Sequence, residues 1–389
     1  MYKISEMAKK LNVSISTLRS WDKKGTLIPN RTKTNRRAYT HEQYLSMVST
    51  SHHKSNQIDN SVILITGSGT LATCAVNFLK DKCKKIIVYS RDEHKQRVMR
   101  NKFRDIKCVR YIIGNIMDKD KLMSAMRNVD FCIHTAALKM IETGLYSADQ
   151  VVKTNVIGSM NVAEVAIERG IKKALFISSD KACNPMNGLT YGLTKALAES
   201  AWLSYNNHSV RGGTSFVATR YGNIIDSNNS FYDILEEQKK SGKITVTDSD
   251  MYRFYFTIEE AMDLNVFAIE DSLGGEVYIP KLKSANIMTF VDAFAEGYPI
   301  KYTGQRGIEK ISEEMIADYE MKYTYMCRDE INNREYYKIV PPYIREHNVG
   351  WDRYRPLENQ IKTFKYSANS LDVEKLSIDD LKKMIKRGK

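Results

Sequence analysis

The spacing of apolar residues changes at residue 61. From there on, short apolar runs typical of buried strands alternate with longer stretches whose apolar positions follow a helical period. The predicted strands are residues 62–65, 85–89, 109–113, 129–134, 174–178 and 215–220. The clearest helical patterns are residues 71–80, 149–169 and 191–206. Strands that alternate with helices predict a doubly wound parallel sheet, so we expect an α/β fold for residues 61–389, with a smaller C-terminal lobe mainly from residue 222 onward.

Residues 1–48 follow a different pattern and predict a compact helical module. The expected order is a helix over residues 5–10, a second over 14–24, a basic loop or wing over 30–39, and a third helix opened by a capping box of Thr40 and Gln43. Gly25 suits the end of the second helix. Residues 49–60 are polar and lack periodicity, which predicts a linker between two domains.

Composition indicates a globular protein with an acidic partner. Hydrophobic residues make up 42% of the 389 residues and charged residues 27%, so wholesale disorder is not expected. The formal net charge is +13, and residues 1–48 hold ten lysines and arginines against three acids. More than half of the excess charge therefore lies in the small module, which suggests that this module meets the acidic partner.

Cysteine usage and apolar runs indicate the compartment. The six cysteines show neither CxxC pairs nor metal-ligand spacing, which favours a reducing environment and no metal site. Lys9 and Lys10 interrupt the only apolar start, and no run approaches the about eighteen apolar residues of a membrane span. His52 and His53 are interpreted as part of the linker. We therefore expect a cytoplasmic protein without a membrane segment.

The first module resembles a family of regulators. Residues 4–25 together with 36–39 are similar to the winged helix-turn-helix of MerR-type regulators and of some transposon resolvases. The resemblance implies that the helix over residues 14–24 enters the major groove of DNA while the wing contacts phosphate. The DNA-binding candidates are Ser16, Thr17, Arg19, Arg36 and Arg37. The alternative is a small interaction module whose basic face is merely solvated.

The turn after the first strand of the α/β region has the spacing of a dinucleotide-binding loop. Gly67, Gly69 and Ala72 give a GxGxxA pattern, which provides a tight turn, close approach of the backbone to a pyrophosphate, and packing of a small residue at the helix start. A strand before the turn and a helix after it make the pattern more specific. The sequence therefore predicts a Rossmann-type sheet that binds a dinucleotide.

The end of the second predicted strand bears on the choice of cofactor. An acid at this position normally selects NAD, but Ser90 and Arg91 stand there. Because a guanidinium suits a 2′-phosphate, we expect NADP. If Arg91 points away, Asp92 could instead serve the ribose hydroxyls of NAD.

The stretch after the fifth predicted strand holds candidate proton-transfer groups. Asp180 and Lys181 come first, and Tyr191 and Lys195 follow one helical turn apart, so that the ammonium can favour the phenolate. Tyr191 alone among the 23 tyrosines has a lysine four residues on, but about two such pairs are expected by chance. Position is the stronger argument, because the stretch begins at the carboxyl end of a strand, where open α/β sheets bind ligands. A surface ion pair is the alternative for Asp180 and Lys181.

Most of residues 61–387 resemble the extended short-chain dehydrogenase/reductases, and within them the UDP-N-acetylglucosamine 4,6-dehydratases that invert C5. The similar segments are residues 87–93, 133–139, 153–158, 179–185, 191–195, 220–223, 253–257, 274–281, 306–310 and 366–381. Many segments in one order are far more specific than any single motif. The resemblance implies a substrate-binding C-terminal lobe, a UDP-sugar substrate and a role in polysaccharide biosynthesis.

The resemblance also implies a lyase mechanism with tightly bound NADP. Tyr191, assisted by Lys195, would take the proton of the sugar 4-hydroxyl while hydride passes from C4 to the cofactor. Lys181 would then remove the C5 proton and Asp180 would protonate the departing 6-hydroxyl, before hydride returns to C6. We also expect the protein to be a homo-oligomer.

The remaining site residues follow from the same resemblance. Ser179 would bond the sugar 4-oxygen, Asn155 would support the helix of Tyr191, and Ala136 with Ala137 would pass under the cofactor. The cofactor-binding candidates are Gly67, Gly69, Thr70, Leu71, Ala72, Ser90, Arg91, Asn115, Ala136, Ala137, Asn155, Tyr191 and Lys195. The substrate-binding candidates, which include cations suited to a diphosphate, are Lys139, Asn223, Arg253, Arg306 and Lys310.

The sequence departs from the family pattern at several places. The glycine turn is one residue shorter and ends in alanine, Ser179 replaces a threonine, residues 184–191 are two residues longer, and the loops at 226–230 and 306–310 differ. These changes leave the particular substrate open more than the chemistry. Two alternatives remain: a C4 epimerase of the same fold, which needs Tyr191 but not Lys181, and a DNA-bound sensor that reads a cofactor or sugar nucleotide as a signal.

Overall fold

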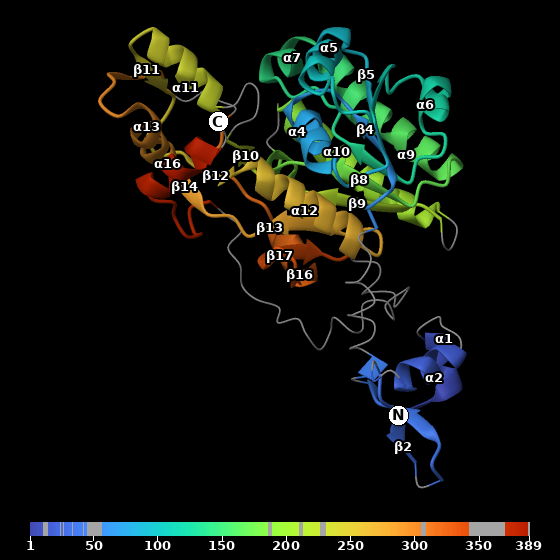
Figure 1. The fold of residues 1–389 in the computed structure, drawn as a ribbon. Coiled ribbons are helices and arrows are strands. Elements are labelled where there is room, and N and C mark those ends of the chain that lie inside the picture. Colours follow the sequence, from blue (N-terminus) through green and yellow to red (C-terminus); the bar gives the residue numbers. More distant parts are fainter. Residues whose placement is uncertain are drawn as a thin grey trace. The chain divides into compact units, whose positions relative to one another are not determined.

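The computed structural model (Figure 1) describes most of the chain. The described residues are 1–10, 15–23, 25, 27–32, 34–41, 43–44, 57–185, 189–209, 213–225, 231–304, 309–341 and 370–387. They form two compact units, Met1–Gln57 and Ile58–Lys389. The predicted linker, with its two histidines, lies mainly outside the described residues.

The first unit combines two helices with a three-stranded antiparallel sheet. Its elements are β1 (Tyr2–Lys3), α1 (Ile4–Lys10), α2 (Ile15–Lys23), β2 (Asn30–Arg31) and β3 (Arg37–Tyr39), and the strands pair in the order β1-β3-β2. Met7, Leu18 and Tyr39 are fully buried in its core. The first two predicted helices are present, and the predicted wing is a hairpin of β2 and β3. The third predicted helix lies mostly outside the described residues. The capping box is also present, because Thr40 and Gln43 exchange two hydrogen bonds of 2.9 and 3.0 Å.

The second unit is built on a nine-stranded sheet in the order β16-β17-β13-β9-β8-β7-β4-β5-β6. Its strands are β4 (Val62–Thr66), β5 (Lys85–Ser90), β6 (Val109–Ile113), β7 (Phe131–His134), β8 (Lys173–Ile177), β9 (Ser215–Thr219), β13 (Val277–Pro280), β16 (Thr324–Asp329) and β17 (Arg334–Ile339). The six strands from β4 to β9 are parallel, and the chain order switches direction between β4 and β7. This is the predicted Rossmann-type arrangement, and all six predicted strands are confirmed within two residues.

The sheet also continues past β9, which the sequence pattern did not predict. β13 adds in parallel, and β17 and β16 then add as an antiparallel hairpin.

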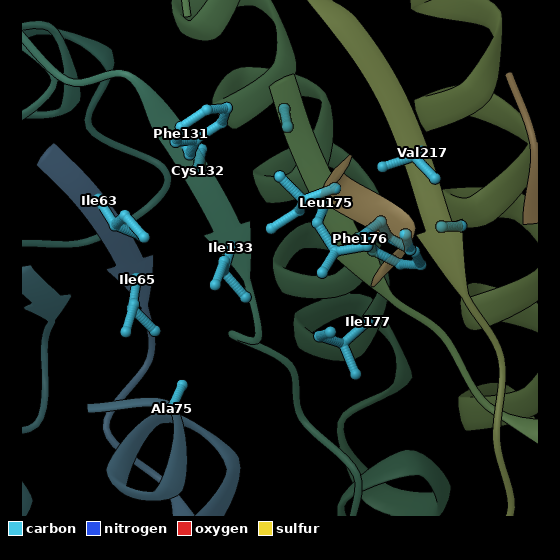
Figure 2. Close-up of a cluster of buried hydrophobic side chains, with 14 of the residues drawn as sticks. Ile63, Ile65, Ala75, Phe131, Cys132, Ile133, Leu175, Phe176, Ile177 and Val217 are labelled. Carbon is cyan, nitrogen blue, oxygen red and sulfur yellow. The ribbon is translucent and has the colours of Figure 1, made fainter. Parts of the chain in front are cut away.

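Helices pack against this sheet and against one another. They are α4 (Thr70–Leu79), α5 (Glu93–Lys102), α6 (Lys119–Ala125), α7 (Ile141–Tyr146), α8 (Ala148–Val152), α9 (Gly158–Glu168), α10 (Thr190–Ser204), α12 (Ile258–Asp271) and the short turns η3 (Tyr205–Asn207) and η4 (Asp318–Tyr323). The helix predicted over residues 149–169 is α8 and α9, joined by a π-helical turn, η1 (Lys153–Ile157). Side chains of the central strands, such as Ile63, Ile133 and Leu175, form the buried core (Figure 2).

The predicted smaller lobe is present and has its own core. It contains β10 (Asn223–Ile224), α11 (Phe231–Lys240), β11 (Ile244–Val246), β12 (Tyr252–Phe256), β14 (Ser284–Asn286), α13 (Ile287–Ala295), β15 (Ile300–Tyr302) and α16 (Ile378–Arg387). β10, β12 and β14 form one small sheet, and β11 pairs with β15. Leu235, Ile244 and Phe290 are fully buried between these elements. Among the described residues, none of the helices combines the length and the apolar character needed to cross a bilayer.

Candidate active site

The turn after β8 carries the first candidate groups. Asp180 opens a short helical turn, η2 (Asp180–Ala182), and is 1% exposed. Its carboxylate oxygen Oδ1 accepts hydrogen bonds from the Ser179 hydroxyl at 2.7 Å and from the Lys181 backbone N–H at 2.8 Å. The Asp180 N–H donates to the Tyr221 carbonyl at 3.2 Å, which ties the turn to the segment that follows β9. Asp180 is therefore held firmly at the carboxyl edge of the sheet.

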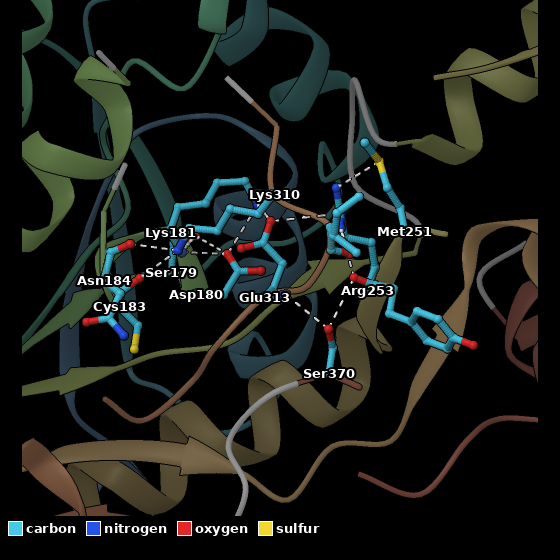
Figure 3. A network of polar contacts seen from close by, with 12 residues as sticks. Ser179, Asp180, Lys181, Cys183, Asn184, Met251, Arg253, Lys310, Glu313 and Ser370 are labelled. Carbon is cyan, nitrogen blue, oxygen red and sulfur yellow. Dashed lines mark hydrogen bonds and ion pairs between the residues drawn. The ribbon is translucent and has the colours of Figure 1, made fainter. Parts of the chain in front are cut away.

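Lys181 lies between two carboxylates (Figure 3). Its ammonium Nζ is 3.3 Å from Asp180 Oδ1 and 3.7 Å from Glu313 Oε1. Glu313 Oε1 is in turn 3.8 Å from Arg253 Nε. We call Asp180, Lys181, Arg253 and Glu313 the Lys181 cluster. Burial alone lowers the pKa of Lys181, but the charges of Asp180 and Glu313 outweigh it and raise that pKa above its usual range.

Glu313 was not predicted from the sequence. Its side chain is 4% exposed, and burial raises its pKa while the charge of Lys181 opposes that rise. It stands in a polar stretch beside Glu314, so its composition resembles a solvated surface segment. Only the fold reveals that Glu313 turns inward while its neighbour does not.

Tyr191 stands in the first turn of α10 and faces the same cluster. Burial raises its pKa, the charge of Lys181 lowers it, and a hydrogen bond with Ser179 also lowers it. Gly192 allows this approach, because a Cβ at that position would lie 2.8 Å from the Lys181 carbonyl oxygen. Of the residues that precede the helix, 186–188 lie outside the described ones, so the two-residue extension is described only at its ends.

The Lys195 ammonium is directed at a backbone carbonyl. It donates to the Ile177 carbonyl and lies 3.9 Å from the centre of the Phe176 ring. Burial lowers the pKa of Lys195 to about 7, and the charge of Glu199 opposes that shift. That Lys195 supports the phenolate stays a prediction, since its ammonium is directed at the Ile177 carbonyl in this structure. One helical turn puts both residues on one face, but the long lysine side chain reaches a buried carbonyl instead.

Asn155 connects the loop after β7 to the tyrosine helix. It belongs to the π-helical turn η1 and exchanges hydrogen bonds of 2.8 and 2.9 Å with the backbone of Leu138. Its amide also donates to the Thr194 hydroxyl at 3.1 Å. Asn155 therefore fixes the segment that contains Ala136, Ala137 and Lys139 against α10, where the sequence expected it to act.

The glycine turn has the geometry of a dinucleotide cradle. Gly67 has a φ of +93°, and a Cβ there would lie 2.7 Å from the Thr135 hydroxyl oxygen and 3.3 Å from the Ala136 backbone. Gly69 precedes α4, whose first turn holds Thr70, Leu71 and the fully buried Ala72. Free backbone N–H groups at such a helix start suit a phosphate. The turn therefore fits a nucleotide cofactor.

The residues at the end of β5 are those that bear on the choice of cofactor. Ser90 is buried and its hydroxyl lies 2.9 Å from that of Ser68. Asp92 caps α5, because its carboxylate accepts from the Lys95 N–H at 2.9 Å and pairs with the Lys95 ammonium at 3.1 Å. Arg91 is exposed. The carboxylate of Asp92 is thus engaged with the helix start, while Arg91 stands at the edge.

The remaining predicted cofactor- and substrate-binding residues lie on several different elements. Asn115 follows β6, where its side chain accepts from the Met117 N–H at 3.1 Å. Asn223 opens β10. Burial lowers the pKa of Lys139, while the charge of Asp233 opposes that shift. Arg306 lies outside the described residues.

Two predicted diphosphate ligands are bound to backbone carbonyls here. The Lys310 ammonium donates to the Cys183 and Asn184 carbonyls at 3.2 and 2.6 Å. Arg253 donates to the Tyr252 and Ile311 carbonyls at 2.8 and 3.1 Å. Arg253 belongs to the Lys181 cluster and Lys310 lies beside it (Figure 3), and both hold neighbouring segments together.

In the first unit, the DNA-binding candidates lie on two elements. Ser16, Thr17 and Arg19 stand on α2, and Arg36 and Arg37 on the hairpin. Arg36 is exposed, whereas Arg37 forms an ion pair of 2.6 Å with Asp22, which also pairs with Arg31 at 3.0 Å. Arg37 therefore anchors the hairpin to α2.

Two family models match parts of the chain. Residues 63–334 match the family described as polysaccharide biosynthesis protein, and residues 3–39 match the MerR family of regulatory proteins.

Three individual proteins illustrate the similarity. The chain is 38% identical over 284 residues to the UDP-N-acetylglucosamine 4,6-dehydratase (inverting) of Campylobacter jejuni, across 72% of this chain and 82% of that one. It is 32% identical over 292 residues to the UDP-glucose 4-epimerase of Rickettsia massiliae, across 72% and 83%. The crystal structure of Pen from Bacillus thuringiensis is similar with a TM-score of 0.74 and 28% identity, across 85% of this chain and 99% of that one.

Proposed function

The chain belongs to the family of polysaccharide biosynthesis proteins, and from this premise we propose that it is a nucleotide-sugar 4,6-dehydratase. The substrate we propose is UDP-N-acetylglucosamine, and the product is a 4-keto-6-deoxy sugar nucleotide with C5 inverted, as the name of the Campylobacter relative suggests. One observation carries the proposal: the Asp180–Lys181 ion pair of 3.3 Å stands after β8, where the start of α10 with Tyr191 packs against the Lys181 carbonyl through Gly192. The group for oxidation and the pair for elimination therefore share one site.

The proposed reaction divides the proton transfers among three side chains. Tyr191 takes the proton of the sugar 4-hydroxyl, and the Ser179 hydroxyl bonds the same oxygen. The resulting 4-ketone acidifies C5, and a neutral Lys181 takes the C5 proton. Asp180 donates a proton to O6, which leaves as water. Each transfer of this kind contributes about 10²- to 10⁴-fold to the rate.

A nicotinamide cofactor, when bound, supplies the acceptor for the C4 hydride and returns it at C6. The residues that would hold it are Gly67, Gly69, Thr70, Ser90, Arg91 and Asn155. We propose NADP, because the carboxylate of Asp92 is engaged with α5 and Arg91 remains for a 2′-phosphate. Mass spectrometry of the nucleotide released from purified, denatured protein identifies the cofactor.

The deciding experiment incubates the purified full chain with UDP-N-acetylglucosamine. We expect a 4-keto-6-deoxy product, detected by mass loss of one water and by NMR of the C6 methyl group. Solvent deuterium should appear at C5. If neither this sugar nor any other UDP- or dTDP-hexose is turned over, the enzyme proposal is wrong.

A C4 epimerase is the second candidate, and the similarity to the Rickettsia epimerase favours it. Epimerisation needs hydride transfer and Tyr191 but no base at C5. The variant Lys181→Ala separates the two reactions. Abolished turnover supports the dehydratase, whereas sugar-nucleotide epimerisation that survives in this variant supports the epimerase.

The first unit motivates a third proposal, that the chain also binds DNA. Its match to the MerR family and its excess of basic residues support this function. Salt-dependent binding that prefers one DNA sequence would support it, and we expect Arg36→Ala to weaken binding and reduce the salt dependence by about one phosphate contact. DNA binding without turnover of any nucleotide sugar would favour the sensor over the enzyme.

A further inference from the structure

Glu313 is buried inside the Lys181 cluster, yet its contacts leave one oxygen unused. Its Oε1 lies 3.7 Å from the Lys181 ammonium and 3.8 Å from Arg253 Nε. Its Oε2 is buried and has no hydrogen-bond partner among the described residues, and the same holds for Asp180 Oδ2. A buried carboxylate oxygen without a partner lowers stability. The cluster is therefore not arranged for stability alone.

The backbone of Glu313 is fixed from outside the cluster. Its N–H donates to the Ser370 hydroxyl at 3.0 Å, and its carbonyl accepts from the Ser370 N–H at 2.9 Å. Ser370 also donates to the Tyr252 carbonyl at 3.2 Å, which joins the contact to β12. Because two hydrogen bonds hold this one residue, the carboxylate of Glu313 stays directed at Lys181 (Figure 3).

Charged groups surround Lys181 from several elements. Asp180 stands on η2, Glu313 on the segment after β15, Arg253 on β12 and Tyr191 on α10, and Lys139 also acts on Lys181 from the loop after β7. In the part of the chain that the structure describes, only the two carboxylates lie within 4 Å of the ammonium as opposite charges. Asp180 is adjacent to Lys181 in sequence. Glu313 is therefore the negative charge that a distant part of the chain brings to the Lys181 ammonium.

We propose that Glu313 is a positioning residue that keeps Lys181 protonated in the resting site, so that Lys181 first serves Tyr191 as a cation and acts as a base only afterwards. The catalytic meaning of this order rests on the proposed function. A cationic Lys181 favours the tyrosinate that accepts the proton of the 4-hydroxyl. Once Tyr191 is neutral, Lys181 has lost one of the negative charges around it and passes its proton to Asp180 Oδ1, 3.3 Å away. Lys181 is then the neutral base for the C5 proton, and Asp180 holds the proton that it donates to O6.

The test measures the charge of Lys181 without turnover. Acetic anhydride acylates only neutral amines, and the Lys181 side chain is 31% exposed, so the reagent can reach it. Peptide mass spectrometry gives the acylation rate of Lys181 in the full chain at a series of pH values. Glu313→Gln should move the midpoint of this profile down by about one pH unit, which makes acylation about tenfold faster at a fixed pH below the midpoint.

Two further variants control for altered access. Glu313→Asp keeps the charge and should stay within about threefold of the wild type, since the effect is mainly electrostatic. Glu335 lies on β17 and forms an exposed ion pair with Lys281. Glu335→Gln removes this carboxylate and should leave the acylation midpoint of Lys181 unchanged. A midpoint that does not move in Glu313→Gln overturns the proposal.

Wild-type protein provides a test that does not depend on folding of a variant. Its Lys181 midpoint should lie above the ordinary lysine value of about 10.4, and a midpoint at or below that value also overturns the proposal. The two proposals can fail separately. Wild-type protein without turnover but with the shifted midpoint contradicts only the proposed function, whereas turnover with an ordinary midpoint contradicts only the role of Glu313.

Discussion

The second unit contains two buried groups of charges that differ in how completely their hydrogen bonds are used. In the Arg220 cluster, formed by Arg220, Glu199 and Glu320, the guanidinium makes five hydrogen bonds: four to the two carboxylates and one to the Met315 carbonyl. In the Lys181 cluster, both carboxylates keep a buried oxygen without a partner among the described residues.

The difference separates a structural role from a functional one. Arg220 has its full set of donors paired in a fixed geometry, so it has no donor left for a substrate. The Lys181 cluster has only long contacts to Glu313, and its ammonium acts on Tyr191. The carboxylates of both clusters are largely buried. Incomplete hydrogen bonding is the feature that distinguishes the proposed site of chemistry.

The largest effect is expected from Lys181→Met. Loss of the base should reduce kcat for dehydration by about 10²- to 10⁴-fold. The folded state should persist, because the lysine side chain is already one-third exposed. Turnover assays and urea unfolding on the same preparation check both halves of this prediction. If the variant unfolds, Lys181 has a structural role like that of Arg220 instead.

Arg220→Met should have the next largest effect, on stability. It leaves two buried carboxylates without their cation, and removal of one partner from a buried ion pair costs about 3–5 kcal/mol. Urea unfolding measures the loss. A variant with unchanged unfolding free energy would contradict the distinction between the clusters.

A matched pair of glutamine variants sharpens the comparison. Glu199→Gln should lower the unfolding free energy by about 1–3 kcal/mol, because Arg220 loses a bidentate charged partner. Glu313→Gln should change it by less than about 1 kcal/mol, since Glu313 makes only long contacts with its cations. The order of the two midpoints in urea checks the prediction, and the reverse order would contradict it.

Lys195, which is influenced by Glu199 of the Arg220 cluster, should produce an effect that appears as a dependence of stability on pH. Folded Lys195 loses its proton near pH 7, whereas an unfolded lysine keeps its proton up to about pH 10.4. Between these values the unfolded state binds more protons, so this residue makes stability rise with pH, by at most about 1.4 kcal/mol per unit. Lys195→Met should remove that contribution. The unfolding free energies of wild type and Lys195→Met at pH 7 and pH 9 measure this contribution. The same change with pH in both proteins would contradict the prediction.

The sequence predicted the parts of the fold that depend on local pattern. The six parallel strands from β4 to β9 each carry a buried apolar run, and Gly67 required a positive φ at the turn. β17 and β16 could not be predicted in the same way, because their place depends on pairing with β13 from a distant part of the chain.

In the candidate site, too, local sequence predicts some residues, while others depend on contacts between distant parts of the chain. Asp180, Lys181 and Tyr191 come together because they are close in sequence and flank one strand end. Glu313 contacts them from 132 residues beyond Lys181 in the numbering, in a stretch whose composition resembles a surface. The direction of the Lys195 side chain depends on a competing carbonyl, which no spacing rule contains.

The Ser370 contact has a consequence for synthesis on the ribosome. The nine-stranded sheet is complete in sequence at Ile339, but the partner that fixes Glu313 is encoded 57 residues after it. A nascent chain that has left the exit tunnel up to residue 341 contains every strand of that sheet. Its Glu313 still lacks the two hydrogen bonds to Ser370. The two hydrogen bonds that fix the Glu313 backbone can therefore form only once Ser370 has emerged, after the last strand of the sheet.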